Sequence, residues 1–203
     1  MHSIREPILR QISIADLRPT QITVGLREVA AKRAQWRALG KKRKAFLAQH
    51  IVPVVLGPKG RSYVIDHHHL ARALHEEGIA TISTTVIADL QRLERNAFWV
   101  FLDNRGWLHP FDSAGKRCTY AVIPKSLEEL VDDPYRSLAG EVREGGGYAK
   151  DTTPFSEFIW ADYFRRRINR HELDDDFATC LVEAMKLAKA SEADFMPGWS
   201  GAR

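Results

Sequence analysis

The chain has 203 residues, of which 44% are hydrophobic and 28% are charged, and its formal net charge is +4. These values are ordinary for a soluble globular protein with one core, or a core and a smaller lobe. Two cysteines without metal-ligand spacing exclude a disulfide framework, and no apolar run approaches transmembrane length. Because the start also lacks a signal-peptide core, we expect a cytoplasmic protein with no membrane partner.

The first 90 residues alternate strand-like and helix-like segments. Apolar residues recur at three- and four-residue spacing over Leu26–Leu39, which predicts an amphipathic helix. A second helix is predicted from a run of histidines to near Gly78. Short, mostly β-branched segments predict the strands, at residues 12–14, 51–56, 62–65 and 81–88. Together these segments predict a compact α+β domain over residues 1–90.

The character of the chain changes after residue 90, because no long strand follows. Helical patterns predict four further helices, at residues 90–103, 126–132, 155–168 and 174–190. The last of these carries an apolar stripe that includes Phe177, Leu181 and Met185. We therefore predict a helical lobe over residues 91–203, packed against the α+β domain.

The start of the histidine helix carries the most specific pattern. Asp66 stands where a helix N-cap is expected, and His67, His68 and His69 fill the predicted first turn. A helix start offers unsatisfied N–H groups and the positive end of a dipole, which together bind anions. Histidines add a proton donor or acceptor near neutral pH. A plain cap would account for the aspartate but not for three histidines, so the pattern favours a phosphate-handling site.

The spacing of these histidines separates phosphate chemistry from metal binding. Neighbouring residues on a helix diverge by about 100°, and His68 and His75 lie about 10 Å apart along the axis. One zinc ion cannot bridge that gap, so a metal would need acids from the second lobe. We predict that the segment 66–69 and Arg72 bind phosphate, and that His68 or His69 acts as general acid or base.

A basic segment lies between Arg27 and Lys44, where eight cations accompany the single acid Glu28. Such an excess fits contacts with nucleic-acid phosphates. The alternative is a solvated helix face followed by a basic loop. The residues predicted to contact nucleic acid are Lys32, Arg33, Lys41, Lys42, Arg43 and Lys44.

The second lobe offers further charged candidates. Arg136 follows an acidic turn that ends in proline, which is typical of a helix cap, and it could also close over a bound phosphate. Glu157 and Asp162 stand in an aromatic helix. They either face the histidine site, where they would permit an acid–histidine metal arrangement, or belong to a solvated helix end.

The arrangement of strand, turn, Asp66-x-His68-His69 and helix, with Pro19-Thr20-Gln21 upstream, resembles the ParB/sulfiredoxin superfamily. The greatest similarity is to the ParB-like nuclease branch, and it extends to segments 133–138 and 155–162. The resemblance implies a ParB/sulfiredoxin-like fold and a phosphate-binding motif of the form Asp-Gly-His-His-Arg at the helix start. Neither a sulfiredoxin-type cysteine at the helix start nor a partition-type helix-turn-helix is recognisable in this sequence.

Three positions depart from the pattern of the related free-serine kinases. His67 replaces the motif glycine, Leu70 replaces its arginine, so that Arg72 would substitute, and Gln21 stands where the kinases have a catalytic glutamate. Glutamine cannot act as a general base, which argues against kinase chemistry.

The combined reading predicts a ParB-like nuclease or nucleotide phosphohydrolase that acts at the histidine helix, with a nucleotide or nucleic acid as partner. A nucleotide would bring Mg²⁺ as its cofactor, and the sequence specifies no metal ligands. Two alternatives stay open. One is a nucleotide- or DNA-binding module without catalysis. The other is a small-molecule kinase of the free-serine type, in which Glu28 or Glu157 would replace Gln21.

Overall fold

The structure is a computed structural model that describes residues 8–202. Contacts within the chain divide it into two units, each assembled from three stretches of sequence. Unit 1 comprises residues 8–22, Val29–Pro110 and Cys118–Val131. Unit 2 comprises Thr23–Glu28, Phe111–Arg117 and residues 132–202. This division differs from the predicted one at residue 90, because residues 91–110 and 118–131 group with the sheet rather than with the helical lobe.

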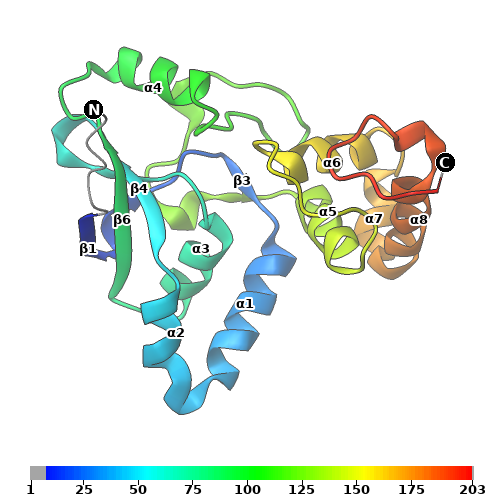
Figure 1. The fold of residues 1–203 in the computed structure, drawn as a ribbon, viewed down its shortest axis with the longest axis horizontal. Helices are drawn as coiled ribbons and strands as arrows, with labels where there is room; N and C mark the ends of the chain where they lie inside the picture. Colours follow the sequence, from blue (N-terminus) through cyan, green and yellow to red (C-terminus); the bar gives the residue numbers. More distant parts are fainter. Residues whose placement is uncertain (1–7, 203) are drawn as a thin grey trace. The chain divides into compact units, whose positions relative to one another are not determined.

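Unit 1 is built on a five-stranded mixed sheet with the strand order β1-β6-β4-β5-β2 (Figure 1). The central strand β4 is buried along most of its length, which explains its continuous run of apolar residues. It pairs parallel with β6 and antiparallel with β5. The strands are β1 Ile8–Ser13, β2 Leu17–Arg18, β4 Val52–Leu56, β5 Ser62–Val64 and β6 Thr81–Asp89.

The sheet is strongly curled. The edge strands β1 and β2 are joined only by the 3₁₀ turn η1, Ile14–Asp16. In a flat sheet four strand spacings would separate these edges by about 19 Å, whereas four extended residues reach at most about 14 Å. A register shift between Val54 and Val55 interrupts the regular pairing of β4 with β6. The two edges therefore approach each other near η1.

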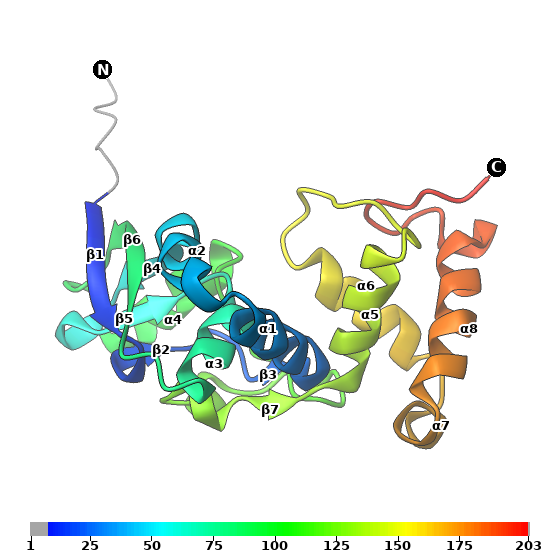
Figure 2. The same ribbon diagram turned by 90° about the horizontal axis from the view of Figure 1, so that it is seen from below.

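Helices cover this sheet, and Figure 2 shows α1 lying beside α3. The α3 helix buries Leu70, Ala71 and Leu74, as the sequence pattern predicts. Among residues 8–202, no helix is both long enough and apolar enough to cross a membrane. The α-helices with residues in unit 1 are α1 Leu26–Ala38, α2 Arg43–Gln49, α3 His68–Glu76 and α4 Arg95–Asn104. The remaining 3₁₀ turns of unit 1 are η2 Gly40–Lys42, η3 Pro58–Gly60, η4 Tyr120–Val122 and η5 Leu127–Glu129.

The segment 126–132 does not form the predicted helix, and that prediction is wrong beyond a single 3₁₀ turn. It forms the turn η5 and then the short strand β7, Val131–Asp132. β7 pairs with β3, Thr23–Val24, in a second, two-stranded sheet. A partner strand about a hundred residues away in sequence provides the hydrogen bonds that a helix would otherwise have supplied.

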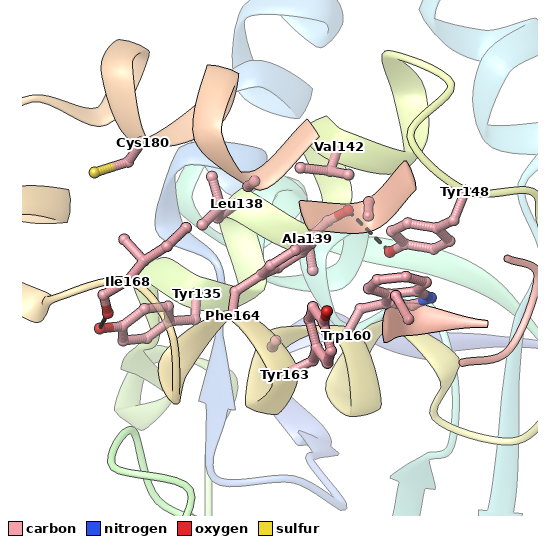
Figure 3. Packing of buried hydrophobic residues seen from close by; sticks show 14 of the residues in the cluster. Tyr135, Leu138, Ala139, Val142, Tyr148, Trp160, Tyr163, Phe164, Ile168 and Cys180 are labelled. Atoms are coloured by element: carbon pink, nitrogen blue, oxygen red, sulfur yellow. Dashed lines mark hydrogen bonds between the residues drawn. The ribbon is translucent and has the colours of Figure 1, made fainter. Parts of the chain in front are cut away.

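Unit 2 is a helical bundle around an aromatic core (Figure 3). The rings of Tyr148 and Trp160 stack at 4.4 Å between centroids. The Tyr148 hydroxyl donates to the Ala139 carbonyl at 2.9 Å, and the Tyr135 hydroxyl donates to the Ile168 carbonyl at 2.8 Å. Buried phenol groups thus keep hydrogen-bond partners inside an apolar core. The helices are α5 Pro134–Glu144, α6 Ser156–Arg165, α7 Arg170–Asp175, α8 Phe177–Lys189 and the 3₁₀ turn η6 Ser191–Ala193.

The predicted fold class, α+β with a C-terminal helical lobe, is confirmed by this architecture. One boundary inside the lobe is corrected, because the helix predicted from residue 174 is split in two. Asp176 caps α8 by accepting from the Thr179 N–H at 3.1 Å, so the chain breaks between α7 and α8.

Candidate functional site

The chain enters α3 through a strained residue. His67 is the N-cap, and its backbone is left-handed, with φ 64° and ψ 28°. This corrects the prediction that Asp66 is the cap. The Asp66 side chain instead accepts from the adjacent His67 N–H at 2.7 Å. A residue with a side chain rarely adopts this conformation, and such strain concentrates at functional sites. His67 also occupies the position of the motif glycine, which would adopt a positive φ without strain.

His68, the first residue of α3, is buried and binds the segment that precedes β3. The Thr20 backbone N–H donates to its Nε2 at 3.2 Å, and the Thr20 hydroxyl donates to the Val64 carbonyl at 2.8 Å. Because a backbone N–H can only donate, Nε2 must be the acceptor. The imidazole is then neutral, with its proton on Nδ1. The structure thus joins the two segments on which the family resemblance rests, Pro19-Thr20-Gln21 and Asp66-x-His68-His69.

A third segment, not singled out from the sequence, completes this region of unit 1. The His109 backbone N–H donates to the Thr20 carbonyl at 2.9 Å, and Gln21 and His109 form a parallel β-bridge. Thr20 and Gln21 are both buried, as are His68 and His69. Since His109 lies about ninety residues from Gln21 in sequence, no local pattern signals that it belongs here. The result is a buried polar cluster beside the first turn of α3.

Arg72, predicted to bind phosphate, has a different set of partners. Its Nε donates to Glu76 Oε1 at 2.5 Å, and its Nη1 donates to the carbonyls of Leu127 and Glu128 at 2.7 and 2.6 Å. These bonds fix the turn η5 against α3 and engage Nε and Nη1 of the guanidinium. We therefore leave Arg72 out of the proposed phosphate site.

The residues predicted to contact nucleic acid divide into two groups. Arg33 is paired with Glu76 and Glu77, each at 2.7 Å, and so ties α1 to α3. Lys32 is half-buried, and Arg43 lies over the Trp36 ring at 5.1 Å. The remaining three, Lys41, Lys42 and Lys44, are exposed at η2 and the start of α2. Arg43 is exposed as well, so these four residues are the members of the set that a phosphate backbone could reach.

In unit 2, Arg136 is buried among charged and aromatic groups. Its guanidinium lies 3.3 Å from the centre of the Phe158 ring, and Nη2 is 3.6 Å from Glu157 Oε2. Burial lowers the pKa of Arg136 to about 10, while the charge of Asp133 opposes that shift. Glu157 also pairs with Arg143. Arg136 is thus part of a charged cluster within unit 2.

The acids of α6 pair with arginines rather than with histidines inside unit 2. Asp162 contacts Arg165 at 3.2 Å and Arg166 at 2.9 Å. Within residues 8–202, no group of three or more His, Cys, Asp or Glu side chains is placed to hold a metal ion.

Comparison with known proteins identifies the family of the chain. The chain is similar over 97% of its length to protein Atu1540 from Agrobacterium tumefaciens, whose crystal structure it matches over 100% of that chain, with 51% identity and a TM-score of 0.91. It matches none of the curated proteins. The family model described as "Putative ParB-like nuclease" matches residues 10–166, which include both motif segments. The chain therefore belongs to the ParB-like nuclease family.

Proposed function

We propose that the protein hydrolyses a phosphoester bond in a nucleotide or nucleic acid at the first turn of α3. The observation that carries the proposal is the bond from the Thr20 N–H to His68 Nε2. It ties the Pro19-Thr20-Gln21 segment to a helix start that is preceded by a strained residue. Structural histidines do not need a left-handed residue before them, whereas anion sites use such backbone turns.

The backbone at residues 67–69 supports phosphate binding. A left-handed residue followed by a helical one, here His67 and His68, turns successive N–H groups toward one concavity. The positive end of the α3 dipole adds to the attraction for an anion. The Asp66 carboxylate already accepts from the His67 N–H at 2.7 Å, so the proposed phosphate contacts are the N–H groups of the two residues that follow. The proposed phosphate site therefore consists of the backbone at residues 67–69, without the predicted Arg72.

The two central histidines take different roles in this proposal. His68 is a positioning residue, because its Nε2 already accepts from Thr20. His69 is the candidate general acid–base. In neutral form it would accept a proton from the water that attacks phosphorus, and in protonated form it would donate that proton to the leaving oxygen. Gln21 cannot remove a proton, but its amide can orient the water or a phosphate oxygen.

Product analysis tests this proposal. Purified protein is incubated with ATP, CTP and plasmid DNA, each with and without Mg²⁺, beside the His68→Ala/His69→Ala variant. His75→Ala is the matched control, because His75 lies in the same helix but pairs with Glu128 at 3.6 Å. We expect turnover of at least one substrate, which the double variant loses and the control keeps. Turnover that survives in the double variant contradicts the proposal, and binding without turnover favours the non-catalytic binding module.

A further inference from the structure

A basic groove lies in unit 1 where the curled edges of the sheet approach each other. It has a volume of about 580 Å³. Its walls come from β1, η1 and β2, from the end of β4, from the start of β5, and from the loop before η5. Ser62, at the start of β5, lines the groove, whereas the far end of β5 leads into α3. The groove and the start of α3 are therefore at opposite ends of this strand.

Positive charge dominates the groove. Arg10, Arg18, Arg61 and Lys125 line it, against the single acid Asp16. Among residues 8–202, Arg18, Arg61 and Lys125 form no ion pair, so their charges face solvent or a ligand. Arg10 is partly balanced by Asp89, whose pKa is lowered mainly by hydrogen bonds from Gln91 and further by the charge of Arg10. Unpaired cations around one concave surface attract polyanions.

The chemistry of the lining selects one kind of polyanion. The cations come from separate elements and are exposed or half-buried, unlike the enclosed cations of a tight small-molecule site. No aromatic side chain is among the lining residues, so the groove offers no platform on which a base could stack. The hydroxyls of Ser13 and Ser62 add neutral donors suited to phosphate oxygens. These features fit a sugar-phosphate backbone contacted independently of sequence.

We propose that this groove binds the phosphate backbone of a nucleic-acid strand, with Arg61 and Lys125, which are exposed and form no ion pair among residues 8–202, as its main contacts. The inference does not depend on the proposed hydrolysis, because binding at the groove needs no chemistry at α3. It assigns a nucleic-acid site to residues outside the basic segment 32–44.

The salt dependence of DNA binding, measured in EDTA, tests the groove. The probe is a labelled single-stranded DNA of about 20 nucleotides, which is longer than one site requires, and binding is followed by fluorescence anisotropy. The variant is Arg61→Gln/Lys125→Gln. Two lost phosphate contacts should weaken binding about 20-fold near 0.1 M salt and reduce the slope of log K against log salt by about 1.4. Thermal unfolding of the variant should match that of the parent, since both side chains are exposed.

The control is Arg92→Gln/Arg95→Gln, which removes the same charge from exposed positions of unit 1 outside the groove. It should bind with nearly the parent affinity and slope. If the two double variants lose equal amounts of DNA affinity, the loss arises from the change in net charge rather than from the groove, and the proposal is overturned. Displacement of the DNA by an equimolar amount of inorganic tripolyphosphate would also overturn it, because a short anion cannot replace a strand held at several separate phosphates.

Discussion

The Thr20 backbone N–H donates to His68 Nε2 at 3.2 Å, across 48 residues of sequence. This bond is buried, and the Thr20 hydroxyl reinforces it by donating to the Val64 carbonyl at the end of β5. One histidine therefore holds the strand end, the helix start and the Thr20–Gln21 segment in a single arrangement. Substitution of His68 should therefore disturb the structure of the site, and any loss of activity should follow from that disturbance.

Replacing His68 with alanine should destabilise the protein by about 2 kcal/mol, because the Thr20 N–H would stay buried without an acceptor. His68→Gln should lose roughly half as much, since its Oε1 can accept the same hydrogen bond. Urea unfolding of the two variants and the parent measures the difference. Equal stabilities for alanine and glutamine would show that the bond contributes nothing.

Because the backbone at His67 is left-handed, we predict opposite changes in stability for two substitutions of this residue. His67→Gly should leave stability unchanged or raise it by up to about 1 kcal/mol, because glycine adopts φ 64° without strain. His67→Val should lower stability by more than about 1 kcal/mol, because a β-branched residue strongly resists this conformation. Denaturation midpoints of the two variants test this ordering, and a glycine variant less stable than the valine variant would refute it.

Acid should weaken the contact between α1 and α3. Side-chain hydrogen bonds from Arg37 and Arg33 lower the pKa of Glu77 from 4.5 to about 2. Because the folded-state pKa lies below the unfolded value, this contribution to stability is present above pH 4.5 and disappears as the pH falls toward about 2. Thermal melts should therefore converge for the parent and Glu77→Gln across that interval. A difference that stays constant from neutral pH to pH 2 would contradict this account.

Asp133 should be essential to unit 2. Its side chain accepts from the Tyr135 N–H at 3.1 Å as the cap of α5, and it pairs with Arg165 at 2.5 Å. Burial raises its pKa, and the charge of Arg165 opposes that shift. Asp133→Ala should cost about 3 kcal/mol, because it removes the cap of α5 and the shorter of two ion pairs of Arg165, which keeps the longer contact to Asp162. Asp133→Asn, which keeps the cap but not the charge, should fall between alanine and the parent in chemical unfolding. A loss below about 1 kcal/mol for alanine would be inconsistent with this role.

Sequence patterns predicted the features that depend on local spacing. The buried face of α3 and the strands β4 and β5 follow from apolar periodicity and turn chemistry, and the structure confirms them. The pairing of strands that are distant in sequence cannot be predicted from local spacing. The strand β7 forms because β3 supplies a partner, so a segment that resembled a helix becomes extended.

The candidate site shows the same limit. The histidine motif is visible in the sequence, but its geometry depends on partners distant in the chain. The sequence pattern assigns Arg72 to phosphate, yet its Nη1 donates to the Leu127 and Glu128 carbonyls of η5. His109 joins the cluster through backbone contacts with Thr20 and Gln21, which are distant in sequence. His67 adopts the left-handed conformation that suits the glycine of the family motif. A histidine at that position does not by itself predict a positive φ.

The most direct test of the central claim is the rate of phosphoester hydrolysis by His69→Ala and by His68→Gln, compared with the parent on the substrate that the parent turns over. The account predicts that His69→Ala loses at least about a hundredfold in kcat, as removal of a general acid–base does. His68→Gln, which preserves the bond to Thr20, should retain most of the parent rate. A His69→Ala enzyme that works at the parent rate would contradict hydrolysis at the start of α3.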